Sequence, residues 1–395
     1  MESHTSQSQR HPVLFHGRAG EYFSIWLVNV LLTIITLGIY SAWATVRRRR
    51  YFYGNTEIAG DRFDYHARPI DILKGRIIVF FGLVLFLIFS AILPSVSLIF
   101  LLAFFALIPW IIIRSWRYNA LMSSFRGVRF NYHCRTGRAY WTMYLAPILM
   151  IAALYLVCAM LGVTAVTSGS VSLAATVGIL IFVLFLAGLA AIQGILAAMN
   201  HDLYINNMAF GQLPFKADLS KKTFIKMVLI SFLIMLPFLI IAGLLISSLF
   251  VSLIYASTMG VTDPQVMGNL MAGNIMNLFL TFVVIIFGGL VSSAYFIAAQ
   301  RNYVFGQTKL GEKLRLKSTL STGSFLALTL TNTLIVIFTL GLGTPIAEVR
   351  LARYIANGTA LEGDISLQEV MAHHDSARTA VAEEVASAFD LSAGI

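Results

Sequence analysis

Long apolar stretches dominate the chain and alternate with shorter polar ones. Eight apolar segments can be recognised, at about 22–46, 77–94, 97–114, 140–162, 171–199, 224–250, 276–299 and 324–349. A helix of about 20 residues crosses the hydrocarbon core of a bilayer. The six middle segments therefore predict six membrane-spanning helices. Short breaks near Pro94, at 167–170 and at 255–265 group these six helices into three pairs.

The charged residues give these pairs an orientation. Hydrophobic residues make up 58% of the chain and charged residues only 12%, against about 25% charged in a soluble domain, so we predict an integral membrane protein. The breaks within pairs contain no Lys or Arg, whereas the connectors between pairs are basic. Because basic loops stay in the cytoplasm, we expect these connectors to be cytoplasmic. Topology thus explains the net charge of +10, and we expect no nucleic-acid partner.

The first and last apolar segments have basic residues on both sides. Each also carries the tripeptide TLG near its middle, with the glycines at Gly38 and Gly341. Glycine weakens a helix, so we predict that both segments are broken helices that dip into the membrane and return to the cytoplasmic side. The alternative is a single kinked span at each end, with both tails outside.

The same two regions resemble each other without a gap. Thr36–Thr56 reads TLGIYSAWATVRRRRYFYGNT, and Thr339–Thr359 reads TLGLGTPIAEVRLARYIANGT. Weaker copies of the tyrosine-to-glycine end of this pattern follow the three middle pairs, at 116–133, 202–218 and 301–317. We interpret the pattern as an internal repeat whose connectors form turns and short strands. Unrelated loops with a shared interface composition are the alternative.

These observations predict an all-α fold: a polytopic transmembrane helix bundle with internal repeats. It would contain six full spans, two terminal broken or re-entrant helical elements, and a small cytoplasmic collar of turns and hairpins. The repeat domain would cover residues 1–365. The remaining residues, 366–395, are acidic and have apolar positions spaced as in a loose amphipathic helix, so we predict a separate C-terminal tail.

Polar residues are scarce inside the apolar segments, so the few that occur there are candidates for a binding site. Asn29 and Asn332 occupy matching positions in the two terminal segments. We predict that they contact a solute or lipid together with the membrane-edge residues Arg47, Arg50, Tyr51, Arg350, Arg353 and Tyr354. The alternative for the asparagines is a hydrogen bond between helices, worth about 0.6 kcal/mol on average.

No motif in the sequence indicates catalysis. The apolar segments hold no Asp, Glu, Lys, Arg or His well inside their limits, and neither a P-loop nor a G-x-S-x-G motif is present. We therefore expect no enzyme activity, no cofactor and no metal site.

The residues from Phe15 to His66 carry a family resemblance. TLGIYSAWA and RRYFYGNT within this stretch are similar to the YjgN family of bacterial inner-membrane proteins, which is defined as a domain of unknown function. The resemblance extends over nearly the whole chain. It implies a multi-pass protein of the bacterial inner membrane, and it implies no active site or substrate.

Two functions remain open at this stage. The first is a channel or transporter for a small anionic or amphiphilic solute, because the basic membrane edge would attract such a molecule. The second is a non-transporting lipid-binding or scaffold protein, in which the same arginines and tyrosines bind anionic headgroups. Membrane lipids are the expected partners in either case, and a homo-oligomer is left open.

Overall fold

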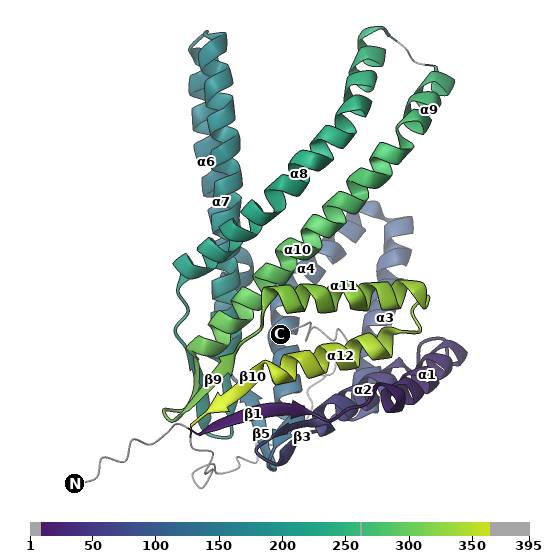
Figure 1. Ribbon diagram of the computed structural model, residues 1–395, viewed down its shortest axis with the longest axis vertical. Helices are drawn as coiled ribbons and strands as arrows, with labels where there is room; N and C mark the ends of the chain where they lie inside the picture. Colours follow the sequence, from purple (N-terminus) through teal and green to yellow (C-terminus); the bar gives the residue numbers. More distant parts are fainter. Residues whose placement is uncertain (1–8, 261–262, 364–395) are drawn as a thin grey trace, which may run out of the picture.

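The computed structural model describes residues 9–260 and 263–363 of the chain. The predicted acidic tail at 366–395 lies outside the described residues. Within them, ten short strands form a closed antiparallel barrel, and pairs of helices extend from it (Figure 1). The prediction of an all-α fold is therefore wrong, because the chain between the helical pairs forms a closed sheet.

The barrel is built from the connectors between helical pairs. Its strands are β1 (Arg10–Phe15), β2 (Thr56–Ile58), β3 (Asp61–Tyr65), β4 (Ser123–Phe125), β5 (Val128–Tyr132), β6 (Met208–Phe210), β7 (Leu213–Ala217), β8 (Thr308–Leu310), β9 (Leu314–Ser318) and β10 (Thr359–Glu362). Four hairpins, from β2–β3 to β8–β9, lie side by side in chain order. In the first two hairpins both turn residues have positive φ, at Ala59–Gly60 and Arg126–Gly127, as a tight two-residue turn requires.

The first strand closes the barrel by pairing with two neighbours in succession. Residues Arg10–Pro12 pair with β10, and residues Val13–Phe15 pair with β2. The two ends of the described chain therefore meet in one sheet, and a segment far from β10 in sequence is needed to complete it. A sheet closed in this way has no free edge.

Aromatic and aliphatic side chains fill the interior of the barrel. All ten strands contribute to a small apolar pocket of about 190 Å³, whose lining includes Phe63, Phe125, Phe130 and Phe210. The ring centroids of Phe63 and Phe125 lie 4.8 Å apart, and those of Phe130 and Phe210 lie 5.0 Å apart. The barrel interior is therefore an apolar core of closely spaced aromatic rings around this small pocket.

Six helices are long and apolar enough to cross a membrane, and they correspond to the six predicted middle segments. They form three pairs: α3 (Pro69–Ile92) with α4 (Pro94–Met122); α5 (Thr136–Tyr140), a π-helical turn (Trp141–Leu145) and α6 (Ala146–Thr167) with α7 (Val171–Ile205); and α8 (Lys221–Thr258), followed by the short α9 (Pro264–Gly273), with α10 (Ile275–Gln307). At most 17% of the apolar window of any of these six helices is buried in the protein. Their exposed apolar surface suits contact with lipid.

The two terminal elements are shorter helical pairs, α1 (Ala19–Ile35) with α2 (Ser41–Gly54), and α11 (Thr322–Phe338) with α12 (Thr344–Asn357). Figure 1 shows them running across the direction of α6 and α7. The strands that flank the first element, β1 and β2, are hydrogen-bonded to each other. The chain therefore enters and leaves this element at the barrel.

Close contact between α7 and α8 depends on one glycine, which leads to a stability prediction. A Cβ added at Gly194 would lie 2.7 Å from the backbone N and Cα of Ile225 on α8. We expect Gly194→Ala to force the helices apart and to destabilise the protein by about 1–3 kcal/mol, measured as thermal unfolding in detergent. Gly178→Ala is the control on the same helix, because nothing lies within 4 Å of its added Cβ. Equal shifts for both variants would contradict this explanation.

Candidate functional site

The two terminal pairs make the same turn at the predicted break positions. Leu37 and Gly38 have φ values of 49° and 93°, and Leu340 and Gly341 have values of 51° and 91°. The N–H of each glycine donates to a carbonyl in the last turns of the preceding helix, at 2.7 Å for Gly38 and 2.8 Å for Gly341. This pattern is a Schellman helix end, which needs a left-handed residue. It turns the chain back within each element.

Apolar side chains lie exposed at both turns. Leu37 is 94% exposed and Leu340 is 93% exposed, and their neighbours Ile35 and Phe338 are also exposed. Leucine in the left-handed region is strained, and an exposed apolar cluster indicates contact with an apolar partner or the membrane. The turns are therefore the parts of the terminal pairs best suited to meet lipid.

The predicted contact tyrosines bind the protein backbone. The Tyr51 hydroxyl donates to the Arg18 carbonyl at 2.9 Å and accepts from the Arg18 N–H at 2.8 Å. The Tyr354 hydroxyl donates to the Ser321 carbonyl at 3.0 Å. Arg18 and Ser321 directly precede α1 and α11. Each tyrosine thus ties the end of one helix to the start of its partner, at the base of the pair.

Two of the predicted contact arginines also bind backbone carbonyls. Arg50 donates to the carbonyls of Tyr65 and Ala67, both at 3.2 Å. Arg353 donates to the carbonyl of Gly17 at 3.0 Å. These carbonyls lie where the chain leaves β3 and β1 for the next helix. The two arginines therefore connect the barrel to the helical pairs.

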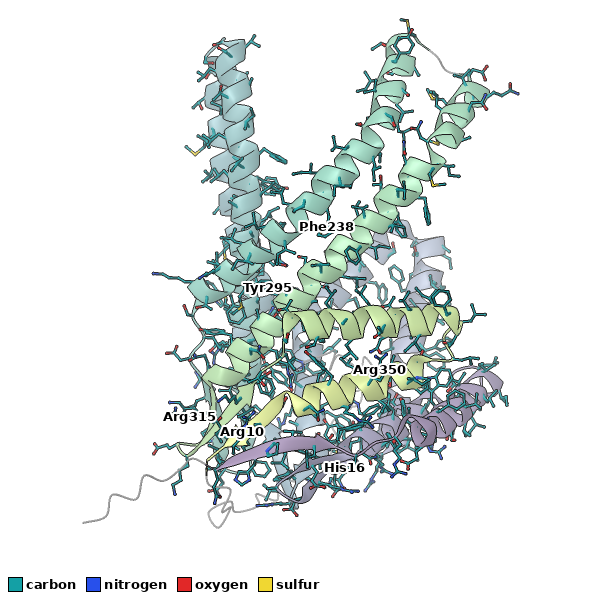
Figure 2. All side chains as sticks on the ribbon, in the orientation of Figure 1. Arg10, His16, Phe238, Tyr295, Arg315 and Arg350 are labelled. Carbon is teal, nitrogen blue, oxygen red and sulfur yellow. The ribbon has the colours of Figure 1, made fainter. Side chains whose placement is uncertain are left out.

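The matching asparagines differ in their surroundings. Arg350 on α12, labelled in Figure 2, is the arginine of the second pair. It donates to the Asn332 side-chain oxygen at 2.8 Å and to the Thr331 hydroxyl at 3.0 Å. Arg47, at the matching position of the first pair, donates instead to the Tyr40 hydroxyl at 3.0 Å. In the second pair, the side-chain oxygen of the asparagine therefore accepts a hydrogen bond from the arginine of the same pair. In the first pair, the matching arginine donates to a tyrosine instead.

Asn29 is the exceptional residue of the first pair. It is only 6% exposed, and its Oδ1 has no hydrogen-bond partner in the described part of the chain. A buried acceptor in this state costs about 1–3 kcal/mol. Asn29 lines a pocket of about 330 Å³ between α1 and α2, together with Tyr22, Trp26, Val30, Thr33, Ile34, Ser41, Ala44, Thr45 and Arg48.

Charged side chains from two other helices reach the edge of this pocket. Glu348 on α12 accepts from the Tyr22 hydroxyl at 2.7 Å and forms an ion pair with Arg48, with Nε and Oε2 3.3 Å apart. Arg76 on α3 donates to the hydroxyls of Thr45, at 3.0 Å, and Ser41. Side chains of four helices therefore contact each other at this pocket.

Tyr22 holds its proton in this arrangement. Burial, and after it the nearby Glu348 carboxylate, raise the pKa of the Tyr22 phenol well above its ordinary value. The phenol therefore remains a neutral donor. Tyr22, Arg48 and Glu348 are contacts that sequence reasoning missed, because no spacing rule links residues of the first terminal pair to one in α12.

The pocket combines polar and apolar groups that can contact a ligand. It offers an unsatisfied acceptor at Asn29, the guanidinium of Arg48 as a donor, and an apolar side formed by Trp26, Val30 and Ile34. Among the described residues, no group of three or more His, Cys, Asp or Glu side chains is placed to hold a metal.

Comparison with known proteins places the chain in a family. Residues 10–388 match a family model described as a bacterial protein of unknown function, DUF898. The chain belongs to the DUF898 family. This DUF898 protein is 30% identical over 375 residues to the inner membrane protein YjgN of Salmonella typhimurium strain LT2, covering 93% of this chain and 92% of the relative.

Two further relatives give the same result. The inner membrane proteins YjgN of Escherichia coli O157:H7 and of Escherichia coli K12 are each 29% identical over 361 residues, covering 90% of the DUF898 protein and 89% of the relative. No solved structure matches the chain. The predicted family and the predicted location as a multi-pass inner-membrane protein are therefore confirmed. All three relatives are named as membrane proteins, and none is named as an enzyme.

Proposed function

We propose that this protein binds an amphiphilic molecule in the pocket between α1 and α2, with the polar head of the molecule against Asn29. The observation that carries the proposal is the buried Asn29 oxygen without a hydrogen-bond partner among the described residues. A ligand N–H or O–H at this position would remove the cost of burying that oxygen. The matching oxygen of Asn332 already accepts from Arg350, so the first pair is the better candidate.

The walls of the pocket favour an amphiphile over a fully polar solute. Hydroxyl groups of Thr33, Ser41 and Thr45 lie on one part of the lining, and Trp26, Val30 and Ile34 form another. Ile34 is 66% exposed and lies one turn before the apolar tip of the pair. A molecule with a polar head and an apolar chain can therefore satisfy both parts and continue into the bilayer.

Charge at the pocket supports a head that both donates and accepts. Arg48 can donate to an anionic oxygen, and Glu348 beside it can accept from a hydroxyl or an amine. Basic loops favour the cytoplasmic side of a membrane, so our proposal takes the barrel and this pocket as cytoplasmic. We therefore propose a lipid of the cytoplasmic leaflet as the bound amphiphile.

Binding has more support than transport. A route through the barrel would pass the apolar cluster that includes Phe63, Phe130 and Phe210, and packed aromatic side chains exclude water and ions. The pocket at Asn29 opens instead on the side of the first helical pair. We propose lipid binding without transport as the primary role.

Asn29→Leu tests the proposal with Asn332→Leu as the matched control. We expect the affinity of Asn29→Leu for the lipid to fall roughly tenfold, which corresponds to about 1.4 kcal/mol of binding free energy. The measurement is the amount of lipid that purifies with the protein, determined by mass spectrometry of extracted lipids. Delipidated Asn29→Leu should unfold at the same or a higher temperature than the delipidated wild type, because a buried unsatisfied acceptor is removed. Asn332→Leu should keep the lipid but unfold earlier, because Arg350 loses its acceptor.

The two readouts separate a binding role from a structural one. If Asn29→Leu retains the wild-type lipid content, the proposed function is wrong. The same conclusion follows if delipidated Asn29→Leu unfolds well below the wild type, because Asn29 would then support the fold itself.

A further inference from the structure

A second pocket, away from Asn29, lies among the long apolar helices. It has a volume of about 320 Å³. Gln193 lines it from α7, Ser231 lines it from α8, and Ser292 and Ser293 line it from α10. None of the described residues that line it is Asp, Glu, Lys, Arg or His. The pocket is therefore polar but uncharged.

The pocket lies deeper in the membrane than the charged residues of its helices. On α7, Asp202 is the last charged residue on the side of the barrel, and Gln193 lies nine residues beyond it. On α8, Lys226 is the last such residue, and Ser231 lies five residues beyond it. A helix rises about 1.5 Å per residue, so these polar side chains lie about 8–14 Å further along the helices. Because charged residues mark the membrane edge, the pocket falls on the hydrocarbon side of that edge.

The serines of this pocket already donate within the protein. The hydroxyl oxygens of Ser231 and Ser292 lie 2.7 Å apart, and the Ser292 hydroxyl donates to the Ser231 carbonyl at 2.8 Å. The Ser231 proton is therefore directed to Ser292. Ser293 donates to the carbonyl of Leu290 at 3.1 Å. Since a hydroxyl has one proton and two lone pairs, these serines can accept from a ligand but have no proton left to donate.

Gln193 is the polar group of the pocket that lacks a partner. Its side-chain amide makes no hydrogen bond within the described part of the chain. The amide offers N–H donors and a carbonyl acceptor, and water is scarce at this depth, so leaving it unpaired is costly. A Cβ added at the next residue, Gly194, would lie 2.7 Å from the backbone of Ile225. Gln193 is therefore held beside the close contact of α7 and α8.

The remaining walls are apolar and lead toward lipid. Phe232 on α8 and Phe296 on α10 line the pocket, and Phe232 is 43% exposed. Figure 1 shows α6 and α7 diverging from α8 and α10 with increasing distance from the barrel. An apolar chain can therefore extend from the pocket into the bilayer. An ionised head does not suit the pocket, because no lining residue carries a charge to pair with it.

We propose that this pocket binds a lipid whose uncharged head both donates and accepts hydrogen bonds, namely a lipid alcohol of the diacylglycerol type. The hydroxyl of the lipid accepts from the Gln193 amide and donates to a serine oxygen, and its acyl chains lie against Phe232 and Phe296. The pocket is separate from the one at Asn29, and the proposal does not rest on the function proposed above.

The test titrates the purified full-length protein with lipid in detergent micelles and measures binding by native mass spectrometry. The probes are dioleoylglycerol, which has a free hydroxyl, and dioleoylphosphatidic acid, which has the same acyl chains and a charged phosphate. Gln193→Met removes the hydrogen-bonding groups at nearly constant length. Gly289→Leu fills the pocket, because Gly289 lines it and nothing lies within 4 Å of its added Cβ. Thr176→Val is the control on α7, since Thr176 is exposed and does not line the pocket.

We expect Gln193→Met to bind dioleoylglycerol roughly threefold to tenfold more weakly, as the loss of one or two hydrogen bonds in a membrane protein implies. Gly289→Leu should weaken this binding at least as much. Both variants should bind dioleoylphosphatidic acid as the wild type does, because the charged head does not enter the pocket. Thr176→Val and Asn29→Leu should bind dioleoylglycerol with unchanged affinity.

Three results would each overturn the proposal. The first is wild-type affinity for dioleoylglycerol in both pocket variants. The second is a lipid-free Gln193→Met protein that melts well below the wild type, because Gln193 would then support the helix contact itself. The third is weaker binding of dioleoylglycerol by Asn29→Leu and not by Gln193→Met, which would assign this lipid to the first helical pair and leave the function proposed above intact.

Discussion

Deleting Arg10–Phe15 is expected to abolish the folded monomer. This segment is β1, which pairs with β10 through its first half and with β2 through its second half. Its loss would leave two unpaired strand edges in place of a closed barrel, and such edges promote aggregation. It would also remove Val13 and Phe15, two buried side chains worth about 1.5–3 kcal/mol each. Size-exclusion chromatography in detergent should show aggregate where the wild type shows a single species.

The control retains the strand but removes outward side chains. Arg10 and Leu14 are exposed, so the double variant Arg10→Ala/Leu14→Ala should stay monodisperse, because its backbone still pairs on both sides. If the deletion variant eluted and melted as the wild type does, β1 would not close the barrel. A disulfide formed between cysteines at His11 and Leu361, which are register partners, in a chain lacking Cys134 and Cys158, would report the closure directly.

Phe210→Asp is expected to unfold the barrel from within. Phe210 is 3% exposed and lies against Phe125 and Phe130, with ring centroids 6.3 and 5.0 Å away. Removing such a ring costs about 3–5 kcal/mol, and burying a carboxylate without a partner adds several more. The measurement is the midpoint of thermal unfolding in detergent, together with the yield of monodisperse protein.

Two control variants distinguish the interior of the barrel from its outer face. Phe210→Leu keeps an apolar side chain and should cost less than about 1.5 kcal/mol if the neighbours repack. Lys216→Asp places the same new charge on an exposed position of β7, opposite Lys309 on β8, where an opposite-charge pair is tolerated. Equal losses for Phe210→Asp and Lys216→Asp would show that the barrel interior is not the packed core described here.

Asn29 and Asn332 match in sequence but differ in their hydrogen bonds. Their matching positions made them equal candidates, yet only Asn332 is bonded to an arginine of its own pair. The difference depends on the direction of the Arg47 and Arg350 side chains and on Glu348, which reaches Tyr22 and Arg48 from the other end of the chain. Contacts at such sequence separation leave no local pattern.

Four of the candidate arginines and tyrosines bind the protein backbone. Position at the membrane edge suggested that Arg50, Arg353, Tyr51 and Tyr354 contact a ligand. In the structure each binds a backbone carbonyl of the protein. A residue type that suits a headgroup also suits an unpaired carbonyl at the base of a helix, and composition alone does not separate the two.

By itself, the sequence determined the family, the inner-membrane location and the six long apolar helices, because burial in lipid requires runs of apolar residues that can be counted directly. It also marked the glycines at which the terminal elements turn. Only the tertiary structure decided that the connectors close a barrel, since most of its strands have three to five residues, too few to show a reliable alternation, and β1 pairs with β10 across almost the entire chain. It also decided which polar groups remain unsatisfied or gather into pockets, because that depends on neighbours brought together from four different helices.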